Sequence, residues 1–322
     1  MTEESLLNFA QQFAQELEVE NAEEWQRYDR FLIAGMGGSA LAAQLFSSFR
    51  PELDLIIHRD YGLPVLPSER WRDRLMIASS YSGNTEETLS AFEEARMKHM
   101  RVAAISTGGK LLEIAKPQDI PFIRLPDLNL RPRLAVGVSF LGLCKLMGDE
   151  ELYEKTRQLA FELRPKELQE QGNRLAQELI GKTPVIYGSG YTFPIANQWK
   201  IIFNETSRIP AFANAFPELN HNEMAGFDIT EGTKELGSKF HIILLKRNGD
   251  LDQVKKRMEV AESLWKARGL QVSEVQLEGR SELLQAFSTI LLGHFAGLAL
   301  AKHYGAVSEK DEMIEDFKKR IA

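Results

Sequence analysis

A polar turn at residues 79–85, Ser-Ser-Tyr-Ser-Gly-Asn-Thr, has the residue types that suit the binding of a small anion. It lies between the apolar run Leu75–Ala78, typical of a buried strand, and a helical pattern that begins at Glu86. The first N–H groups of a helix lack intrahelical partners and lie at the positive end of its dipole, so hydroxyls gathered there favour an oxyanion such as phosphate. The alternative is a capped turn without a ligand, with Asn84 or Thr85 as the N-cap residue.

A glycine-rich turn, Gly35-Met36-Gly37-Gly38-Ser39-Ala40, follows the strand predicted over residues 30–34. It fits the Gly-x-Gly-x-x-Ala pattern of dinucleotide-binding units, and Asp60 follows about twenty residues further on. However, Asp60 lies beyond the end of the next predicted strand, and a dinucleotide does not require the hydroxyl-rich turn. We therefore favour one phosphorylated ligand close to both turns and keep a nicotinamide-dependent oxidoreductase as an alternative.

Two residues in the second half of the chain have side chains that suit proton transfer. Glu205 ends an amphipathic helix, and its alternative role is a solvated ion pair with Arg208. His221 lies in the run Pro-Glu-Leu-Asn-His-Asn-Glu at residues 217–223, where a surface histidine is the ordinary outcome. A histidine that titrates near neutral pH and a desolvated glutamate are the pair that moves protons on a sugar. Arg133 follows a strand end and is either an anion ligand or part of a solvated basic turn.

The composition indicates a folded protein that is long enough for two domains. Its 322 residues are 43% hydrophobic and 26% charged, which excludes the disordered and fibrous classes. The net charge of −7 argues against nucleic acid or an anionic membrane as the main partner. The chain has one cysteine, Cys144, and no His-x-x-x-His spacing, so the sequence predicts neither a disulfide framework nor a metal site.

No segment has the pattern expected of a membrane or targeting element. The most apolar run, Phe287–Ala301, is shorter than the roughly 20 residues that span a bilayer, and we predict a buried helix in which His294 is a core residue. Residues 1–20 have the pattern of an amphipathic surface helix without a signal-peptide core. We therefore expect a soluble, cytoplasmic protein.

Strand and helix patterns alternate along both halves of the chain, which predicts parallel, doubly wound α/β sheets. The predicted strands lie at residues 30–34, 53–58, 75–78, 102–106, 122–125, 184–187, 240–245 and 271–277. The predicted domain borders are an N-terminal helix at 1–29, a first α/β domain at 30–150, a helical connector at 151–180 and a second α/β domain at 181–322. The second domain repeats the strand–Gly-x-Gly–helix unit at Gly188, but Lys246-Arg247-Asn248-Gly249, the counterpart of the hydroxyl-rich turn, has no serine.

The two turns, Asn204-Glu205 and the run 217–223 occur in an order that resembles the bifunctional phosphoglucose/phosphomannose isomerase family, a branch of the SIS-domain sugar-phosphate isomerases. The resemblance extends from about residue 30 to the C-terminus. It implies two SIS domains of flavodoxin-like build in tandem, a homodimer, and catalysis without a metal ion or cofactor. The chain differs from the family pattern at Gln198-Trp199-Lys200 and at residues 305–311.

The same resemblance implies a role for each site residue in the interconversion of glucose 6-phosphate and fructose 6-phosphate, with the preference between glucose and mannose epimers left open. Glu205 is expected to carry a proton between C1 and C2 through a cis-enediol, and Arg133 to stabilise the enediolate. His221 is expected to assist ring opening from across the dimer interface, and Lys318 to match a C-terminal lysine of the substrate site. The residues expected at the phosphate are Ser80, Ser82 and Thr85, with Gly37, Gly38 and Ser39 lining the same pocket. The alternative is a sugar-phosphate sensor that binds without turnover.

Overall fold

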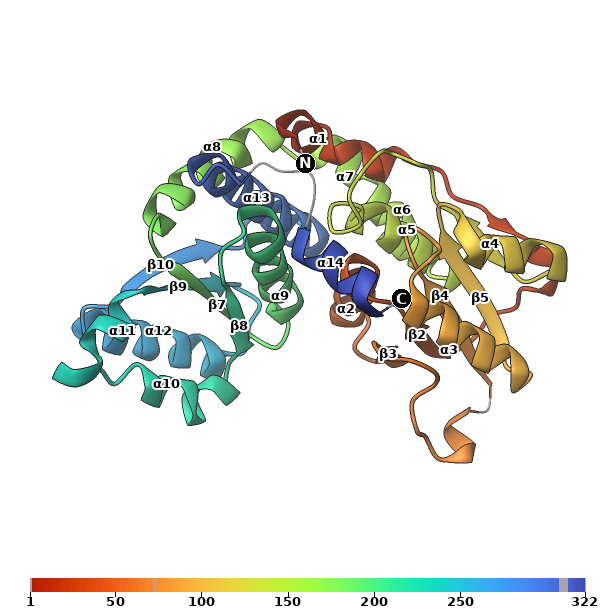
Figure 1. The fold of residues 1–322 in the computed structure, drawn as a ribbon, viewed down its shortest axis with the longest axis horizontal. Helices are drawn as coiled ribbons and strands as arrows, with labels where there is room; N and C mark the ends of the chain where they lie inside the picture. Colours follow the sequence, from red (N-terminus) through yellow and green to blue (C-terminus); the bar gives the residue numbers. More distant parts are fainter. Residues whose placement is uncertain (1, 72, 307–311, 322) are drawn as a thin grey trace. The chain divides into compact units, whose positions relative to one another are not determined.

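The computed structural model describes residues 2–71, 73–306 and 312–321 (Figure 1). The chain forms two compact units. The first unit is Phe9–Leu163, and the second combines Met1–Asn8 with Arg164–Ala322.

The first unit is built on one sheet whose strand order is β1-β6-β5-β4-β2-β3. Its strands are β1 (Val19–Glu20), β2 (Arg30–Ala34), β3 (Asp54–His58), β4 (Arg74–Ser79), β5 (Arg101–Ser106) and β6 (Phe122–Arg124). All neighbours pair in parallel except β1 with β6. Numbered by their sequence, the five parallel strands follow the order 2-1-3-4-5 of flavodoxin-like sheets. The predicted doubly wound α/β fold is confirmed.

Helices cover both faces of this sheet, as a parallel sheet requires. They are α2 (Gly37–Phe49), α3 (Glu86–Met97), α4 (Gly109–Ala115) and α5 (Val136–Leu146). Phe92 of α3 and Leu111 of α4 belong to one buried cluster with Leu32 and Met76 of the sheet. On α2 and α5, the rings of Phe46 and Phe140 lie 5.8 Å apart. The central strands are therefore enclosed, and only the loops at their ends are free to form a site.

The second unit has a smaller sheet with the order β8-β7-β9-β10. Its strands, all parallel, are β7 (Thr183–Gly188), β8 (Phe212–Ala215), β9 (Phe240–Lys246) and β10 (Gln271–Gln276). This order, 2-1-3-4, repeats the first four strands of the other sheet, which supports two copies of one α/β unit. β8 lies outside the strands that we predicted, so the prediction was wrong for this segment. This edge strand has four residues, one exposed and three half-exposed, and its sequence shows little apolar alternation.

The longer helices of the second unit are α8 (Pro165–Leu179), α9 (Phe193–Ile202), α12 (Asp252–Ala267), α13 (Glu282–His303) and α14 (Glu312–Ile321). By length and composition alone, α13 could cross a membrane, but 78% of its apolar window is buried inside the fold. Glycines allow this burial, because a Cβ at Gly293 would lie 2.4 Å from the indole nitrogen of Trp199. The predicted buried helix is confirmed, and His294 is fully buried on it.

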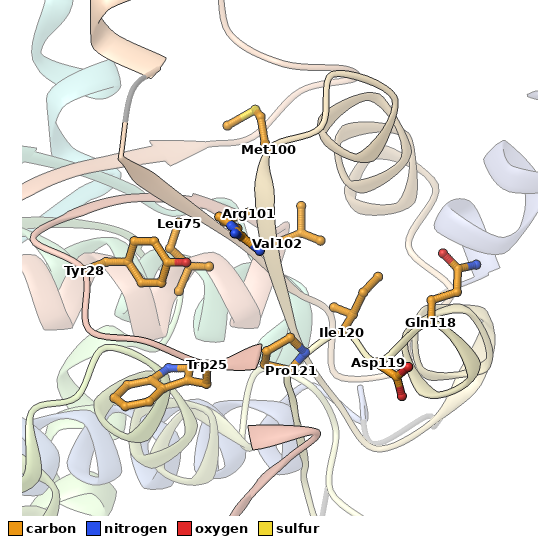
Figure 2. Close-up of a pocket in the computed structure, with 10 residues that line it drawn as sticks. All are labelled: Trp25, Tyr28, Leu75, Met100, Arg101, Val102, Gln118, Asp119, Ile120 and Pro121. Carbon is orange, nitrogen blue, oxygen red and sulfur yellow. The ribbon is translucent and has the colours of Figure 1, made fainter. Parts of the chain in front are cut away.

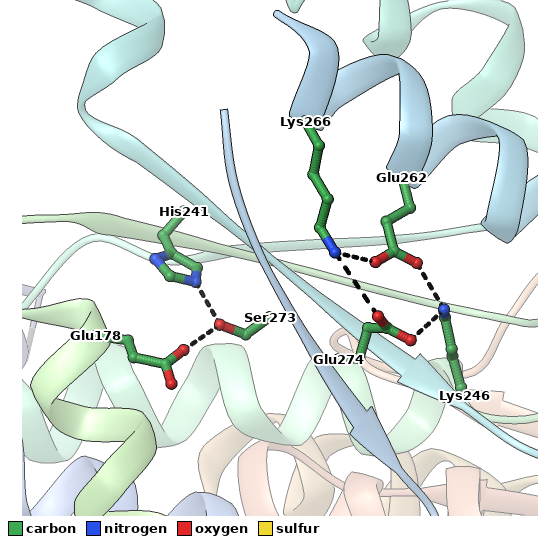
Figure 3. Close-up of polar contacts among 7 residues, drawn as sticks. All are labelled: Glu178, His241, Lys246, Glu262, Lys266, Ser273 and Glu274. Atoms are coloured by element: carbon green, nitrogen blue, oxygen red, sulfur yellow. Dashed lines mark hydrogen bonds and ion pairs between the residues drawn. The ribbon is translucent and has the colours of Figure 1, made fainter. Parts of the chain in front are cut away.

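A network of charged side chains joins α12 to Lys246 of β9 and Glu274 of β10 in the second unit (Figure 3). Glu262 of α12 accepts hydrogen bonds from Lys246 (2.6 Å) and from Lys266 (2.5 Å), and Glu274 of β10 pairs with the same two lysines. Burial by itself raises the pKa of Glu262, but its hydrogen bonds outweigh that effect and lower its pKa to about 2. The network fastens α12 to the sheet.

The N-terminal segment differs from the single helix that we expected over residues 1–29. It forms α1 (Glu3–Leu7), the 3-10 helix η1 (Phe9–Ala14), strand β1 and the 3-10 helix η2 (Ala22–Glu24). Tertiary contacts determine this path. The backbone N–H of Leu17 donates to Tyr153 Oη at 2.8 Å, and Asn21 adopts a left-handed φ of 58°.

The segment predicted as a helical connector, residues 151–180, contains parts of three helices. These are α6 (Glu150–Arg157), α7 (Leu159–Glu162) and α8, and the border between the two units falls at the break before α8. Pro165 begins α8, a position that proline favours because it needs no N–H partner there.

Candidate active site

The glycine-rich and hydroxyl-rich turns lie side by side at the carboxyl end of the first sheet. They follow β2 and β4, which pair directly with Ala34 opposite Ala78. The strand order reverses between these two strands, and ligands of open α/β sheets bind at that point. The backbone N–H of Tyr81 donates to Ser39 Oγ at 3.2 Å, so the two turns are joined.

Within the hydroxyl-rich turn, the side chains of Ser80 and Thr85 share a hydrogen bond of 2.8 Å. Thr85 is the N-cap residue of α3, yet its side chain makes no capping hydrogen bond. Asn84 Oδ1 instead accepts the N–H of Lys110 at 3.1 Å, so within the described residues the capped turn that we considered as the alternative is not formed. Ser82, in the same turn, is exposed. The pKa of Tyr81 is raised, mainly by burial and then by the negative charge of Asp127.

Arg133 belongs to the same end of the first unit. It is 8% exposed, and the segment before it packs on the N-terminus of α2. A Cβ at Gly38 would lie 2.3 Å from the carbonyl oxygen of Pro132 and 3.0 Å from the nitrogen of Arg133. The structure thus brings together seven of the predicted site residues, which are Gly37, Gly38, Ser39, Ser80, Ser82, Thr85 and Arg133. Hydroxyls and helix N-termini favour an anion there.

Glu205 lies in the second unit on a π-helical turn, η5 (Phe203–Ser207), that continues α9. Such turns are rare and occur often at functional sites, because they displace a side chain from the regular helical register. Two hydrogen bonds hold this one in place. Ser207 Oγ donates to the carbonyl of Gly297 on α13 at 2.8 Å, and Asn204 Oδ1 accepts from the N–H of Ala211 at 2.9 Å. Glu205 itself is half-buried.

The structure places Glu205 and His221 of one chain at opposite ends of the second sheet. Helix α9 leads from the carboxyl end of β7 back to the amino end of β8, and Glu205 follows it. His221 ends the 3-10 helix η6 (Glu218–His221), beyond the carboxyl end of β8, with its side chain exposed. The ten residues of α9 span roughly 15 Å between these ends.

Two further residues named in the sequence analysis are Lys318 and Asp60. Lys318 lies on α14, but its side chain is outside the described residues, as is most of the divergent segment 305–311. Asp60 lies two residues beyond β3, and its Oδ1 accepts the N–H of Tyr61 at 2.8 Å. It does not extend from the strand end where a dinucleotide ribose would require it.

The sequence did not reveal how the equivalent end of the second sheet is filled. Ser189 Oγ, after β7, donates to Asp250 Oδ1 at 2.7 Å, and burial raises the pKa of Asp250. The guanidinium of Arg247 lies 3.8 Å from the ring centre of Tyr191 and pairs with Glu282. The hydroxyl of Ser189 is thus hydrogen-bonded to a carboxylate of the protein, whereas that of Ser80 in the first unit is hydrogen-bonded to the hydroxyl of Thr85.

A cavity of about 370 Å³ lies at the opposite end of the first sheet (Figure 2). Its lining includes Leu75 and Arg101, from the amino ends of β4 and β5, together with the rings of Trp25 and Tyr28. Because the two turns follow the carboxyl ends of the strands, this cavity is separate from the predicted anion site.

Several solved structures share this fold. Glucosamine-6-phosphate deaminase from Thermotoga maritima matches with a TM-score of 0.64 and 18% identity, over 94% of this chain and 92% of its own. The C-terminal domain of glucosamine-fructose-6-phosphate aminotransferase from Francisella tularensis matches with a TM-score of 0.63 and 15% identity, over 93% and 94%. The model of the bacterial phospho-glucose isomerase C-terminal SIS domain matches residues 168–321. The fold shared with these structures and the match to the family model together identify a protein with tandem SIS domains.

Sequence relatives narrow the class to one family. The bifunctional phosphoglucose/phosphomannose isomerase of Caldicellulosiruptor bescii is 37% identical over 313 residues, which cover 91% of this chain and 90% of that protein. The protein of the same name from Thermoplasma volcanium is 33% identical over 298 residues, which cover 92% of each chain. The chain belongs to the bifunctional phosphoglucose/phosphomannose isomerase family, as its motifs predicted.

Proposed function

We propose that this protein interconverts glucose 6-phosphate and mannose 6-phosphate with fructose 6-phosphate. The observation that carries the proposal is the pair of joined turns at the switch point of the first sheet, in a chain of this family. In this proposal, Ser80, Ser82 and Thr85 hold the phosphate with the N–H groups of the turns. The binding energy of the phosphate then positions C1 and C2 of the sugar for proton transfer.

Glu205 is the proposed base. It removes the proton from C2 of the open-chain aldose, and the electron pair moves to form a cis-enediolate. Return of a proton to C1 and transfer of the hydroxyl proton complete the ketose, so the reaction needs no oxidant, reductant or metal ion. Arg133 is proposed to stabilise the negative charge of the enediolate, which is the largest electrostatic change along the path. Lys318 is proposed as a further cation at the substrate.

His221 is proposed to open the sugar ring by donating a proton to the ring oxygen. Its separation from Glu205 within one chain supports a homodimer in which each site takes His221 from the second copy. Because the substrates are phosphorylated sugars of central metabolism, we also propose that the protein works in the cytoplasm.

A coupled assay of glucose 6-phosphate and mannose 6-phosphate isomerisation tests the proposal directly. Glu205→Gln should abolish nearly all turnover and still bind fructose 6-phosphate, because the amide keeps the shape of the side chain but cannot accept a proton. The matched control is Glu170→Gln, which changes an exposed carboxylate on α8 and should leave turnover unchanged. A wild-type protein that binds fructose 6-phosphate tightly without isomerising it would instead be a sensor.

Two further measurements separate the remaining alternatives. Micromolar binding of NADH in a fluorescence titration would favour the oxidoreductase and contradict the proposal. Mixed dimers of Glu205→Gln and His221→Ala chains should regain part of the activity, since one of their two sites would be intact. Confirmed mixed dimers without any recovery would place both residues in one subunit.

A further inference from the structure

One carboxylate ties the segment that carries His221 to the second sheet. Glu223 begins α10 (Glu223–Gly226), two residues after His221. Its Oε2 accepts a hydrogen bond of 2.6 Å from Tyr187 Oη on β7, and its Oε1 accepts one of 2.5 Å from Asn214 Nδ2 on β8. Both side-chain oxygens of Glu223 are thus hydrogen-bonded to residues near the C-terminal ends of β7 and β8.

The two donors are themselves held rigidly. Tyr187 is 1% exposed, and its ring centre lies 5.6 Å from that of Trp265. Burial, and then the hydrogen bond to Glu223, raise the pKa of Tyr187, so its hydroxyl stays protonated and remains a donor. The side-chain oxygen of Asn214 accepts the N–H of Ala215 at 2.8 Å, which directs its NH₂ group toward Glu223. A carboxylate between fixed donors has little freedom to move.

The residues next to His221 extend this anchoring along the backbone. Asn222 Oδ1 accepts the N–H of Glu223 at 2.6 Å, and its NH₂ group donates to Glu218 at 2.8 Å. The His221 side chain is exposed and lies on a 3-10 turn of four residues. Its position therefore depends on where the backbone of this short segment is held. Leu219 packs in the core beside β7, and the side chain of Glu223 adds hydrogen bonds to the sheet on the other side of His221.

We propose that Glu223 is a positioning residue that orients His221 through the Tyr187–Glu223–Asn214 contacts. This inference rests on the proposed ring-opening role of His221 and adds the residue that places it. Glu223 does not touch the substrate in this account, so its loss should affect the same step as the loss of His221 and no other.

Two variants of Glu223 distinguish an effect of its hydrogen bonds from an effect of its negative charge. In Glu223→Gln, the amide oxygen can still accept from Asn214, and the amide nitrogen can donate to Tyr187 Oη, which is also an acceptor. This variant should retain turnover within about threefold, whereas Glu223→Ala leaves both donors without a partner. Glu235→Ala is the matched control, because it removes an exposed carboxylate on α11 (Lys234–Ser238), outside the segment that carries His221.

The test compares a substrate that closes a ring with one that does not. Glucose 6-phosphate is mainly cyclic, whereas erythrose 4-phosphate has no free hydroxyl that could form a five- or six-membered ring. For Glu223→Ala we expect at least a tenfold loss of kcat on glucose 6-phosphate and less than a twofold change in deuterium exchange at C2 of erythrose 4-phosphate. In the His221→Ala background, Glu223→Ala should add no further loss, because the two residues act in one step.

The outcomes separate this inference from the proposed function. A selective loss for His221→Ala, combined with equal losses on both substrates or no loss for Glu223→Ala, would overturn the positioning role alone. Fully additive losses in the double variant would overturn it as well. If His221→Ala itself impairs both substrates equally, the ring-opening role fails and the inference fails with it. Thermal unfolding of Glu223→Gln and Glu223→Ala shows whether a loss comes only from misfolding.

Discussion

Replacing Gly38 by alanine should impair catalysis much more than it impairs folding. Gly38 lies in the first turn of α2, where the backbone of Pro132 and Arg133 packs directly on it. The alanine Cβ would lie 2.3 Å from the Pro132 carbonyl oxygen, whereas ordinary contacts begin near 3.4 Å. The neighbours are backbone atoms, so no change of rotamer can relieve the overlap.

The size of the effect follows from the displacement that the overlap requires. The helix N-terminus and the Arg133 segment must separate by roughly 1 Å to restore van der Waals contact. Overpacking of this kind costs about 1–3 kcal/mol of stability. A shift of about 1 Å in a group that contacts the reacting atoms can cost on the order of 100-fold in rate. We therefore expect kcat/KM for glucose 6-phosphate to fall about 100-fold in a protein that remains folded.

The assay measures isomerisation well below the unfolding temperature of each variant. The control is Gly190→Ala, in the corresponding Gly-x-Gly turn of the second unit, where a Cβ would have no neighbour within 4 Å. It should keep kcat/KM within twofold. Wild-type kcat/KM and an unchanged unfolding temperature in Gly38→Ala would refute the reasoning, as would an equal loss in Gly190→Ala.

Three further predictions concern stability and accessibility. The pKa of Glu262 is lowered to about 2 in the folded protein, so its network stabilises the fold above about pH 4.5, and this contribution is lost as the pH falls toward 2. Denaturant titrations should show a loss on the order of 2 kcal/mol in that window, and Glu262→Gln should remove this pH dependence. Gly293→Ala should lower stability by about 1–3 kcal/mol by displacing Trp199, measured by thermal unfolding. Cys144 is buried, and desolvation raises its pKa, so a thiol reagent should label it only at the rate of unfolding; rapid labelling of the native protein would contradict its placement.

Local patterns were sufficient to predict the fold class and the proximity of the two turns that we propose as the anion site. The alternation of strands and helices is a short-range property, and so is the glycine and hydroxyl content of the turns after β2 and β4. Because parallel strands place their carboxyl ends at one edge, two such turns were expected to meet, and the hydrogen bond from Tyr81 to Ser39 joins them. The same patterns failed for residues 1–29 and for β8, where tertiary contacts rather than periodicity determine the backbone.

The sequence by itself determined the family, the α/β architecture and the identity of the candidate residues, because these depend on residue types and spacings along the chain. Only the tertiary structure decided that Glu205 lies on a π-helical turn at one end of its sheet while His221 lies at the other. Only the structure showed that Glu223 accepts a hydrogen bond from Tyr187, 36 residues earlier in the chain. It also showed that Asp250 accepts a hydrogen bond from Ser189 in the turn after β7. The physical reason is that hydrogen bonds between distant segments depend on strand order and burial, which the separations between residues along the sequence do not encode.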